Sequence, residues 1–559
     1  MSQPAAAFAR ELVAALAVHG VEDFVLCPGS RSGPVAHAIV EAASGADGAP
    51  KVTLHVRIDE RSAAFLALGI ARGLAAVGTP RPVAVLTTSG TAVGNLMPAV
   101  MEAHHAGVPL IFITADRPRE LRGVGANQAT DQVGIFGTFV RWSADIAAAA
   151  HDEPPGRATR LASRAAALST GDASSEEAQS APGPVHLNVE FREPLGPDGG
   201  PWPDAPRVEP LFSGSIAVGL AADVFGEPLP NVARGVVVAG DGAGDAARIV
   251  AEAHGWPLFA EPTSGARTGD NCVAEYVSVL AASKGRALAE SAELVVVIGR
   301  PTLTRGIQDL ISSASLLYVA AHGARWREAP QHAAQVHARV PRAWLDRPQE
   351  APDQGWVALW LELAQGNTVA NEWNAHTVAA QWLTALGADG LAVVGSSGPI
   401  RAIDRVAPSW PVGRAPQLLA NRGLSGIDGT VSTAVGVALG ARRPVEALMG
   451  DVTFLHDVGG LLVGPLEERP HVRIVVVNDG GGTIFSSLEH SEAAQAHLKR
   501  VFTTPHDVQI APLCAAYGAG YSRAESVAEL RMALRRKPRA IEVVEAIVAG
   551  HNESGPSGR

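Results

Sequence analysis

Short runs of β-branched residues alternate with Ala-rich segments along the whole 559-residue chain. In the first third of the chain the runs are DFVLCPG, PVAVLTTSG, PLIFITADRP and GPVHLNVEF. Such alternation predicts strands that pair in parallel and are connected by helices lying on both faces of the sheet. We therefore expect an α/β protein built from doubly wound parallel sheets.

The length and two breaks in composition divide the chain into three parts. A chain of 559 residues is too long for one hydrophobic core. The Pro/Gly-rich stretch LGPDGGPWPDAP ends the first part, and a second connection begins near residues 347–355. We expect α/β domains at residues 1–195, 205–350 and 370–559. The polar segment 169–183 is expected to be a surface loop.

Composition excludes several classes of protein. A net charge of −11 argues against a nucleic-acid-binding face. The three cysteines, at 27, 272 and 514, match neither a disulfide framework nor a metal-binding spacing, which indicates a reducing, intracellular compartment. The first twenty residues read as an amphipathic helix, and no apolar run is long enough to span a membrane. We expect a soluble, cytoplasmic protein.

Two acidic groups follow strand-like runs in the last third of the chain. EALM leads into Gly450 and Asp451, and RIVVV leads into Asn478, Asp479 and the three glycines 480–482. Ligands of doubly wound sheets bind at the carboxyl ends of parallel strands. Two carboxylates and the exposed carbonyls of a Gly-rich turn suit a hard cation such as Mg²⁺, which is often shared with phosphate groups. The spacing predicts a metal and phosphate site.

A carboxylate at residue 60 has two interpretations. The strand-like VTLHVRI gives way to Asp59, Glu60 and Arg61, and then to a small-residue apolar helix. Acidic residues are common in the first helical turn, where they interact with the helix dipole. The alternative is a catalytic acid. This stretch alone favours the helix-terminal role.

The paired acidic turns resemble the diphosphate-binding motif of thiamine-diphosphate enzymes. By this resemblance Asp451, Asp479 and the carbonyl of Gly481 would ligate Mg²⁺ or Mn²⁺. Asp479 replaces the common Asn and adds a charge, and Val452 stands where the motif has a glycine. The resemblance implies pyrimidine-binding, middle and diphosphate-binding domains, in that order, with the middle one transhydrogenase-like.

The same resemblance changes the interpretation of Glu60. In those enzymes a glutamate at a strand end in another domain hydrogen-bonds the pyrimidine ring of thiamine. Sharing a proton with the ring nitrogen favours the imino tautomer, whose own nitrogen removes the C2 proton of the thiazolium. Glu60 has this context, so the resemblance implies that it is the catalytic residue.

A closer resemblance covers nearly the whole chain. The segments that carry it are CPGSRSGPVAHAI, RIDERSAAFLALGIAR, TTSGTAVGNLMPAVMEA, ITADRPRELRGVGANQATDQ, GPVHLNVEFREPL, ANRGLSGIDGTVSTAVG, GDVTFLHDVGGL and NDGGGTIF. They resemble the 2-succinyl-5-enolpyruvyl-6-hydroxy-3-cyclohexene-1-carboxylate synthase family of menaquinone biosynthesis. That family of transferases decarboxylates 2-oxoglutarate on thiamine diphosphate and adds the resulting succinyl carbanion to isochorismate.

The resemblance also implies the residues that bind cofactor and substrate. Both substrates are dicarboxylates, which guanidinium groups bind in a bidentate fork. Each arginine of the motifs could instead form a structural ion pair, but their joint occurrence in loop motifs favours binding. Ile427 would be the apolar wedge that bends thiamine, and Ile484 would line the substrate side together with Phe485. The other expected cofactor contacts are Ser89, Gly90, Ser397 and Gly450, and the expected substrate contacts are Ser30, Arg31, Arg117, Asn127, Gln128, Ser397, Arg401, Arg422 and Phe485.

The family resemblance implies a homodimer or homotetramer whose catalytic sites are shared between subunits. Two alternatives stay open. One is a relative of acetolactate synthase or benzoylformate decarboxylase that uses monocarboxylate 2-oxo acids, which would need fewer arginines. The other is a non-catalytic, cofactor-binding subunit, which would not need Glu60.

Other conspicuous residues are expected to be structural. His104 and His105 lie outside the resembling motifs, and a role at a helix start suffices for His456 and Asp457. The sequence GDGAGD at 240–245 imitates a phosphate loop and would be vestigial. Arg267 and Arg305 are embedded in motifs, and the sequence does not decide whether they contact a substrate, an effector or neither.

Overall fold

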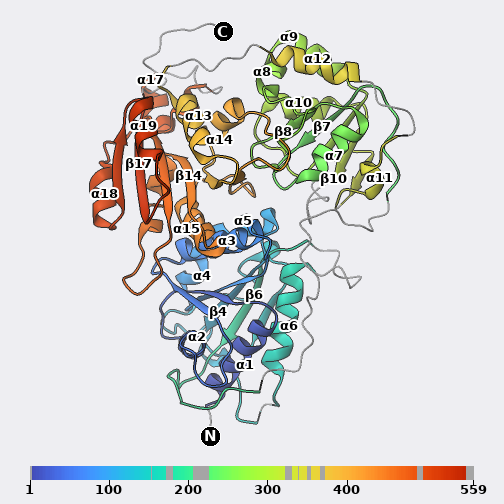
Figure 1. The fold of residues 1–559 in the computed structure, drawn as a ribbon. Coiled ribbons are helices and arrows are strands. Elements are labelled where there is room, and N and C mark those ends of the chain that lie inside the picture. The colour runs from blue at the N-terminus through green and yellow to red at the C-terminus, as the bar shows by residue number, and fades with distance from the viewer. Residues whose placement is uncertain are drawn as a thin grey trace. The chain divides into compact units, whose positions relative to one another are not determined.

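The computed structural model describes residues 3–152, 154–171, 181–204, 226–320, 330–337, 339–348, 354–365, 372–487 and 495–548. It contains three sheets whose strands are all parallel, with helices packed against them (Figure 1). The predicted fold class is thereby confirmed. The predicted loop at 169–183 lies largely outside the described residues, and Ser169 and Thr170 are the buried end of a helix.

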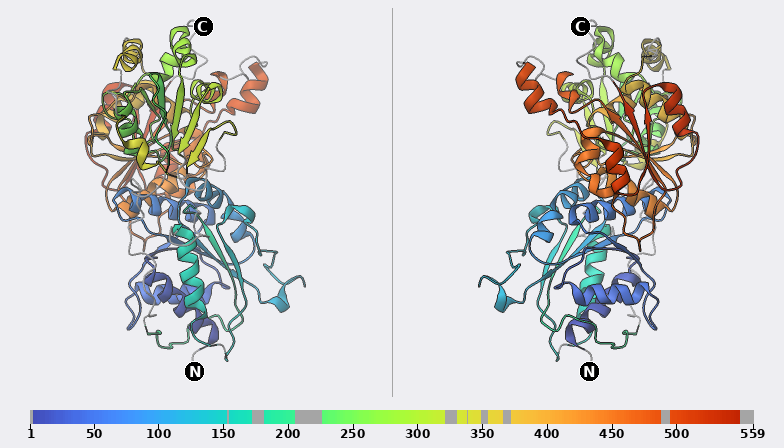
Figure 2. Two further views of the ribbon diagram at one scale, coloured as in Figure 1. Left: turned by 90° about the vertical axis from the view of Figure 1, so that its right-hand side faces the viewer. Right: turned by 90° about the vertical axis from the view of Figure 1, so that its left-hand side faces the viewer.

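The first sheet has six strands in the order β2-β1-β3-β4-β6-β5. Helices α1, α2 and α6 contribute to the core on one face, and α3 packs on the strands from the other face (Figures 1 and 2). The bounds are α1 (Pro4–Val18), β1 (Asp23–Leu26), α2 (Gly33–Ala43), β2 (Thr53–Val56), α3 (Glu60–Ala76), β3 (Val83–Thr87), α4 (Thr91–Asn95), α5 (Met97–Ala106), β4 (Leu110–Asp116), β5 (Ser143–Ile146), α6 (Arg157–Thr170) and β6 (Val185–Glu190).

Helix α15 (Thr430–Ala441) packs against α3 through glycines. A Cβ atom at Gly436 would lie 2.2 Å from the carbonyl oxygen of Leu66, and one at Gly69 would lie 2.2 Å from that of Thr433. Only glycine permits this approach of two helix backbones. One compact unit accordingly comprises Met1–Ile216, Asp428–Arg443 and Asp457–Pro470. This unit combines segments from the first and last thirds of the chain because they pack together. It therefore does not test the predicted domain boundaries, which stay predictions.

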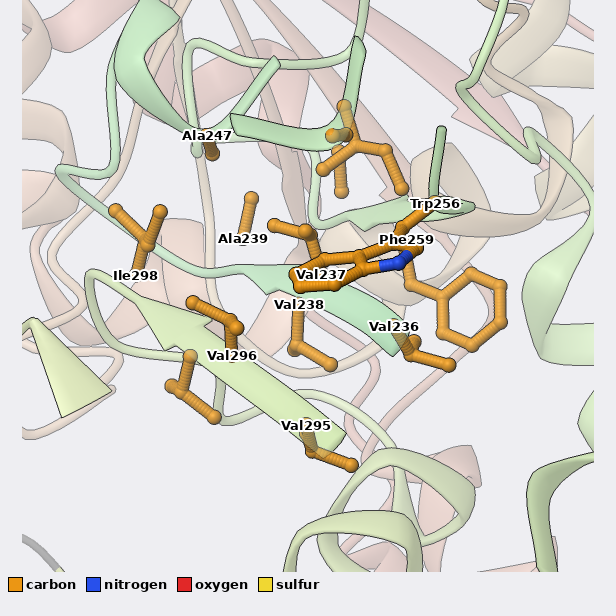
Figure 3. Close-up of a cluster of buried hydrophobic side chains, with 14 of the residues drawn as sticks. Val236, Val237, Val238, Ala239, Ala247, Trp256, Phe259, Val295, Val296 and Ile298 are labelled. Atoms are coloured by element: carbon orange, nitrogen blue, oxygen red, sulfur yellow. The ribbon is translucent and has the colours of Figure 1, made fainter. Parts of the chain in front are cut away.

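The second compact unit comprises Ala217–Ile427, Pro444–His456 and His471–Arg559, and its described residues contain the other two sheets. The five-stranded sheet has the order β11-β10-β9-β7-β8. The valines of β7 and β9 pack with Trp256 and Phe259 in its core (Figure 3). Its elements are β7 (Gly235–Ala239), α7 (Asp245–His254), β8 (Leu258–Ala260), α8 (Tyr276–Ala281), α9 (Ser283–Glu290), β9 (Leu294–Ile298), α10 (Arg305–Ser313), β10 (Leu317–Ala320), β11 (Gln335–His337), α11 (Arg342–Leu345) and α12 (Gln354–Ala364).

The last sheet has six strands in the order β13-β12-β14-β15-β17-β16. Helices α13, α14 and α19 share one hydrophobic core with its strands. Its elements are α13 (Ala375–Leu386), β12 (Leu391–Val394), α14 (Gly398–Val406), β13 (Gln417–Leu419), β14 (Val445–Gly450), α16 (Asp451–His456), β15 (Val472–Asn478), α17 (Gln495–His497), α18 (Ile510–Ala516), β16 (Gly520–Ala524), α19 (Val527–Leu534) and β17 (Ile541–Ile547). No helix in the described part of the chain is both long enough and apolar enough to cross a membrane.

Candidate functional site

Glu60 is the first residue of α3 and follows β2, which ends at Val56, after three intervening residues. The helix is capped by its neighbour, because Asp59 Oδ1 accepts a hydrogen bond from the backbone N–H of Ser62 at 3.1 Å. The half-buried Glu60 accepts only a long bond from Asn95 Nδ2, at 3.4 Å to Oε2, among the contacts described. Asp59 therefore fulfils the helix-terminal role that the sequence also allowed for Glu60.

The strand end before Glu60 is held by an acidic residue. The backbone N–H of Val56 donates to Glu467 Oε2 at 2.8 Å, and Arg57 Nη1 lies 3.8 Å from the same oxygen. Cys27 is buried nearby, and burial, followed by the charges of Glu60 and Asp59, raises the pKa of its thiol. The thiol therefore stays protonated and is not a nucleophile.

The turn after β3 is interlocked with a second loop. Ser89 Oγ donates to the Gln128 carbonyl oxygen at 2.8 Å, and Gln128 Nε2 donates to the Ser89 carbonyl oxygen at 2.9 Å. Gly90 has a φ of 84°, and a Cβ atom there would lie 2.9 Å from Gln128 Cγ. Glycine is therefore required at 90, both by the backbone conformation and by the close approach of Gln128.

Arg117 and Arg31 place two buried guanidinium groups near each other. Arg117 donates to the Asn127 carbonyl oxygen from Nε and Nη2, at 3.2 and 2.8 Å, while Arg31 Nη1 donates to the Phe191 carbonyl oxygen at 2.8 Å. Burial, and next the charge of Arg117, lower the pKa of Arg31. Arg31 Nε is buried and has no hydrogen-bond partner among the described residues. An anion is the ligand that such a pair would favour.

The loop that carries Asn127 and Gln128 is anchored by Gln132, which the sequence did not single out. Gln132 is fully buried; its Oε1 accepts from the Gly90 N–H at 2.9 Å, and its Nε2 donates to Asn188 Oδ1 at 2.9 Å. Position 132 belongs to a motif, but nothing in its residue type marks it as an anchor. Ser30, Asn127 and Gln128 are themselves exposed.

A cavity of about 450 Å³ lies beside this loop. Arg122 lines it and forms ion pairs with Asp116 at 2.8 Å, Asp145 at 2.9 Å and Glu190 at 3.2 Å. The loop is thus held near its start by Arg122 and near its end by Gln132. The other lining residues are Gly123, Gly125, Ala126, Ala129, Thr130, Asp131 and Val133.

In the second unit the two acidic turns meet, as adjacent strands require. Gly450 pairs with Val477 across β14 and β15, so both strands end side by side. Asp451 is 2% exposed; its Oδ1 accepts from the Val452 N–H at 2.7 Å, and its Oδ2 accepts from the Gly481 N–H at 2.9 Å. The predicted ligands Asp451 and Gly481 are therefore in direct contact.

The two buried carboxyl groups of Asp451 and Asp479 are suited to a cation. Burial raises the pKa of Asp451, although backbone hydrogen bonds oppose the shift. Burial also raises the pKa of Asp479 to about 6; the Thr483 hydroxyl bond opposes the rise, and the charge of Asp451 adds to it. A bound divalent cation would offset both the burial and the mutual repulsion. No group of three or more His, Cys, Asp and Glu side chains in the described part of the chain is arranged for a metal. The predicted ligand set contains only two such side chains, Asp451 and Asp479, and takes its third oxygen from a backbone carbonyl.

The glycines of the two turns have different surroundings. A Cβ atom at Gly450 would meet nothing within 4 Å, so the space above this turn is open. Gly481 has a φ of 140°, and a Cβ atom there would lie 2.4 Å from the Thr503 carbonyl oxygen. The donor set and the open turn fit a metal-bound diphosphate, whose close approach glycine permits.

The Gly-rich turn is supported by Asn478 and by two residues that the sequence did not reveal, Glu545 and Tyr521. Asn478 Oδ1 accepts from the Gly480 N–H at 3.1 Å, and Asn478 Nδ2 donates to Glu545 Oε1 at 2.6 Å. Tyr521 donates to the other oxygen of Glu545 at 2.5 Å. Glu545 lies on β17, 67 residues after Asn478, and no motif points to it.

Ser397, Arg401 and Arg422 lie at the start of α14 and in the loop after β13. Ser397 has a φ of 74°, and its carbonyl oxygen accepts from Arg401 Nη1 at 3.0 Å. Arg422 is buried and donates to the hydroxyl of Thr302. Desolvation, and next the charge of Arg422, lower the pKa of Arg401. These two guanidinium groups again form a cationic pair.

The three apolar residues predicted to line the site are half-buried. Ile427 precedes α15, and Ile484 and Phe485 lie in the 3₁₀ turn Thr483–Ser487. The Phe485 ring lies 5.6 Å from that of Phe502, centroid to centroid. Their contacts with a cofactor or substrate stay predictions.

The expected structural residues have identifiable contacts. His104 Nδ1 lies 2.9 Å from the Phe139 carbonyl oxygen. Asp457 is fully buried and caps α15, because its Oδ2 accepts from the Ser432 N–H at 2.7 Å. Asp457 therefore serves the start of α15. Its carboxylate makes no capping bond to the 3₁₀ turn Val458–Leu461 that directly follows it in the sequence.

Two conspicuous motifs lie in the part of the chain that contains the five-stranded sheet. Arg267 is 2% exposed and donates to the carbonyl oxygens of Ala260, Ala274 and Ala407 at 2.6–2.7 Å, a structural role. In GDGAGD a Cβ atom at Gly240 would lie 1.9 Å from the backbone of Arg300, so this glycine serves packing. Arg305 begins α10, and its role stays undecided.

Comparison with known proteins identifies the family. Residues 7–135 match the family described as "Thiamine pyrophosphate enzyme, N-terminal TPP binding domain", and residues 405–544 match its C-terminal counterpart. The chain is 43% identical to 2-succinyl-5-enolpyruvyl-6-hydroxy-3-cyclohexene-1-carboxylate synthase of Nocardioides sp., over 98% of this chain and 96% of that protein. It is 44% identical to the synthase of the same name from Kineococcus radiotolerans, over 98% and 96%. The chain belongs to this synthase family.

The family membership confirms the resemblance found in the sequence, and it confirms a thiamine-diphosphate-dependent enzyme. A solved structure described as benzoylformate decarboxylase from Polynucleobacter necessarius aligns with a TM-score of 0.67. It covers 97% of this chain and 99% of the other at 17% identity, so it supports the shared fold alone. The individual roles of the synthase-like residues described above stay predictions.

Proposed function

We propose that this enzyme decarboxylates 2-oxoglutarate and adds the four-carbon unit that remains to isochorismate, releasing CO₂ and 2-succinyl-5-enolpyruvyl-6-hydroxy-3-cyclohexene-1-carboxylate for menaquinone biosynthesis. The observation that carries the proposal is identity above 40% over nearly the whole length of synthases with that name. The two cationic pairs, Arg31 with Arg117 and Arg401 with Arg422, support it because both substrates are dicarboxylates.

The roles of the residues follow from their chemistry. Bound thiamine diphosphate supplies the electron sink for loss of CO₂ from a 2-oxo acid. Asp451, Asp479 and the Gly481 carbonyl would hold Mg²⁺ or Mn²⁺ and, through it, the diphosphate. Glu60 would share a proton with the pyrimidine ring nitrogen, while the arginines orient the substrate carboxylates.

The product assay tests the proposal directly. We expect CO₂ release from 2-oxoglutarate, and formation of the six-membered-ring adduct only when isochorismate is also present. Pyruvate and benzoylformate are the control substrates, because a monocarboxylate leaves one cationic pair without a partner. Turnover of either control at a rate equal to that with 2-oxoglutarate would favour the acetolactate-synthase alternative. Absence of any CO₂ release would favour a non-catalytic subunit.

We further propose a cytoplasmic homodimer or homotetramer whose catalytic sites are shared between subunits, as in the resembling family. Mixing Glu60→Gln with Asp451→Ala protein after subunit exchange is expected to restore part of the activity, because a mixed dimer carries one site with both groups intact. Exchange is verified with differently tagged chains. No restoration after proven exchange, or a fully active monomer in sedimentation at assay concentration, contradicts shared sites.

A further inference from the structure

His506 contacts a predicted metal ligand, although it belongs to none of the motifs that the sequence singled out. Its Nε2 lies 3.2 Å from Asp451 Oδ2, the oxygen that also accepts from the Gly481 N–H. The two residues are 55 positions apart in the sequence. The His506 side chain is 16% exposed and that of Asp451 is 3% exposed, so the contact is shielded from solvent.

A second contact assigns the hydrogen of this imidazole. The backbone N–H of Val508 donates to His506 Nδ1 at 3.4 Å. A ring nitrogen that accepts a hydrogen bond carries no hydrogen, so in the neutral ring the hydrogen is on Nε2. His506 Nε2 therefore donates to Asp451, and in this tautomer it cannot itself ligate a metal.

Three donors then surround the carboxylate of Asp451. The Val452 N–H is bound to Oδ1, and the Gly481 N–H and His506 Nε2 are bound to Oδ2. A carboxylate offers about four acceptor positions, so about one remains for a cation. Hydrogen bonds of this kind orient metal-ligating groups, and their removal typically lowers metal affinity or activity by about 10–100-fold.

The backbone that carries His506 is packed onto the Gly-rich turn. The Gly482 N–H donates to the Thr503 carbonyl oxygen at 2.7 Å, and the Thr504 N–H donates to the Lys499 carbonyl oxygen at 2.9 Å. Thr504 has a φ of 42°, a conformation that non-glycine residues rarely adopt. This sharp reversal after the π-helical turn Leu498–Thr503 brings His506 to Asp451.

We propose that His506 is a positioning residue for the divalent cation: its Nε2–H holds the Asp451 carboxylate in a fixed orientation that leaves one acceptor position for the metal. The proposal rests on the proposed function, because that function supplies the metal site. It assigns no contact between His506 and the metal, the cofactor or the substrate.

The test compares two substitutions that differ in hydrogen-bonding capacity. His506→Leu removes the donor, whereas His506→Gln retains an N–H at the end of a side chain of similar reach. Binding of Mn²⁺ in the presence of thiamine diphosphate is measured by electron paramagnetic resonance, and binding of Mg²⁺ by calorimetry. His471→Leu is the matched control, because His471 is exposed just before β15. Thermal melting without metal verifies that each variant is folded.

We expect His506→Leu to weaken Mn²⁺ and Mg²⁺ binding by roughly 10–100-fold and to change the zero-field splitting of bound Mn²⁺. His506→Gln is expected to stay within about threefold of the wild type, and His471→Leu to match it. Wild-type affinity in His506→Leu, or equal losses in the Leu and Gln variants, overturns the positioning role.

Asp451→Ala separates this inference from the function on which it rests. Loss of metal binding in Asp451→Ala together with wild-type binding in His506→Leu overturns the inference alone. Wild-type metal affinity in Asp451→Ala overturns the metal site itself, and the role of His506 with it.

Discussion

Glu60→Gln is expected to leave a folded protein that binds most of its cofactor and has lost nearly all turnover, by roughly 10³-fold. The amide still accepts and donates hydrogen bonds, but it cannot exchange a proton with the pyrimidine nitrogen. Folding is preserved because the N-terminus of α3 is capped by Asp59, whose Oδ1 binds the Ser62 N–H. Turnover, thermal melting and exchange of the C2 proton of thiamine are measured on the same preparation.

The neighbouring carboxylate provides a matched control for this prediction. Asp59→Asn makes the same acid-to-amide change one residue earlier, and Asn caps helices as well as Asp does. We expect Asp59→Asn to retain activity within a few-fold of the wild type, since only the charge at the cap changes. Normal C2 proton exchange in folded Glu60→Gln protein, or an equal loss of turnover in both variants, contradicts the catalytic assignment of Glu60.

Asp451→Ala is expected to abolish the metal-dependent affinity for thiamine diphosphate, with a loss above the roughly 10–100-fold typical of residues that only support a metal ligand. Alanine offers no oxygen to the cation, and the diphosphate would then face the Asp479 carboxylate without shielding. The Gly481 N–H also loses its acceptor, so the Gly-rich turn is less well ordered for the cofactor. The measurement is a titration of thiamine diphosphate at several Mg²⁺ concentrations.

Asp479→Asn is the comparison for this prediction and is expected to be mild. Asn retains an oxygen ligand, and it removes a carboxylate whose pKa burial raises to about 6. The affinity for cofactor at saturating Mg²⁺ should therefore stay close to that of the wild type. Equal cofactor affinity in Asp451→Ala and the wild type would refute the metal assignment.

The alternation of strands and helices could be predicted because each element leaves its own periodicity in the sequence. The run VAVLT became β3, buried at every position, and RIVVV became the centre of β15. The position of Asp451 and Asp479 followed for the same reason, since acidic residues after neighbouring parallel strands meet at one edge of the sheet. The packing of α15 on α3 could not be predicted, because it depends on glycines about 370 residues apart that approach each other's backbone.

The sequence by itself determined the α/β class, the strand ends that carry Glu60, Asp451 and Asp479, and the family to which the chain belongs. These follow from local periodicity and from continuous motifs. Only the tertiary structure decided which residues support those groups. Gln132 reaches Gly90, and His506 reaches Asp451, through hydrogen bonds between loops whose paths local residue preferences do not specify. Gln132 is 42 residues from Gly90 in the sequence, and His506 is 55 residues from Asp451. Such contacts leave no periodic signal in the sequence, because they depend on where the folded backbone places each side chain.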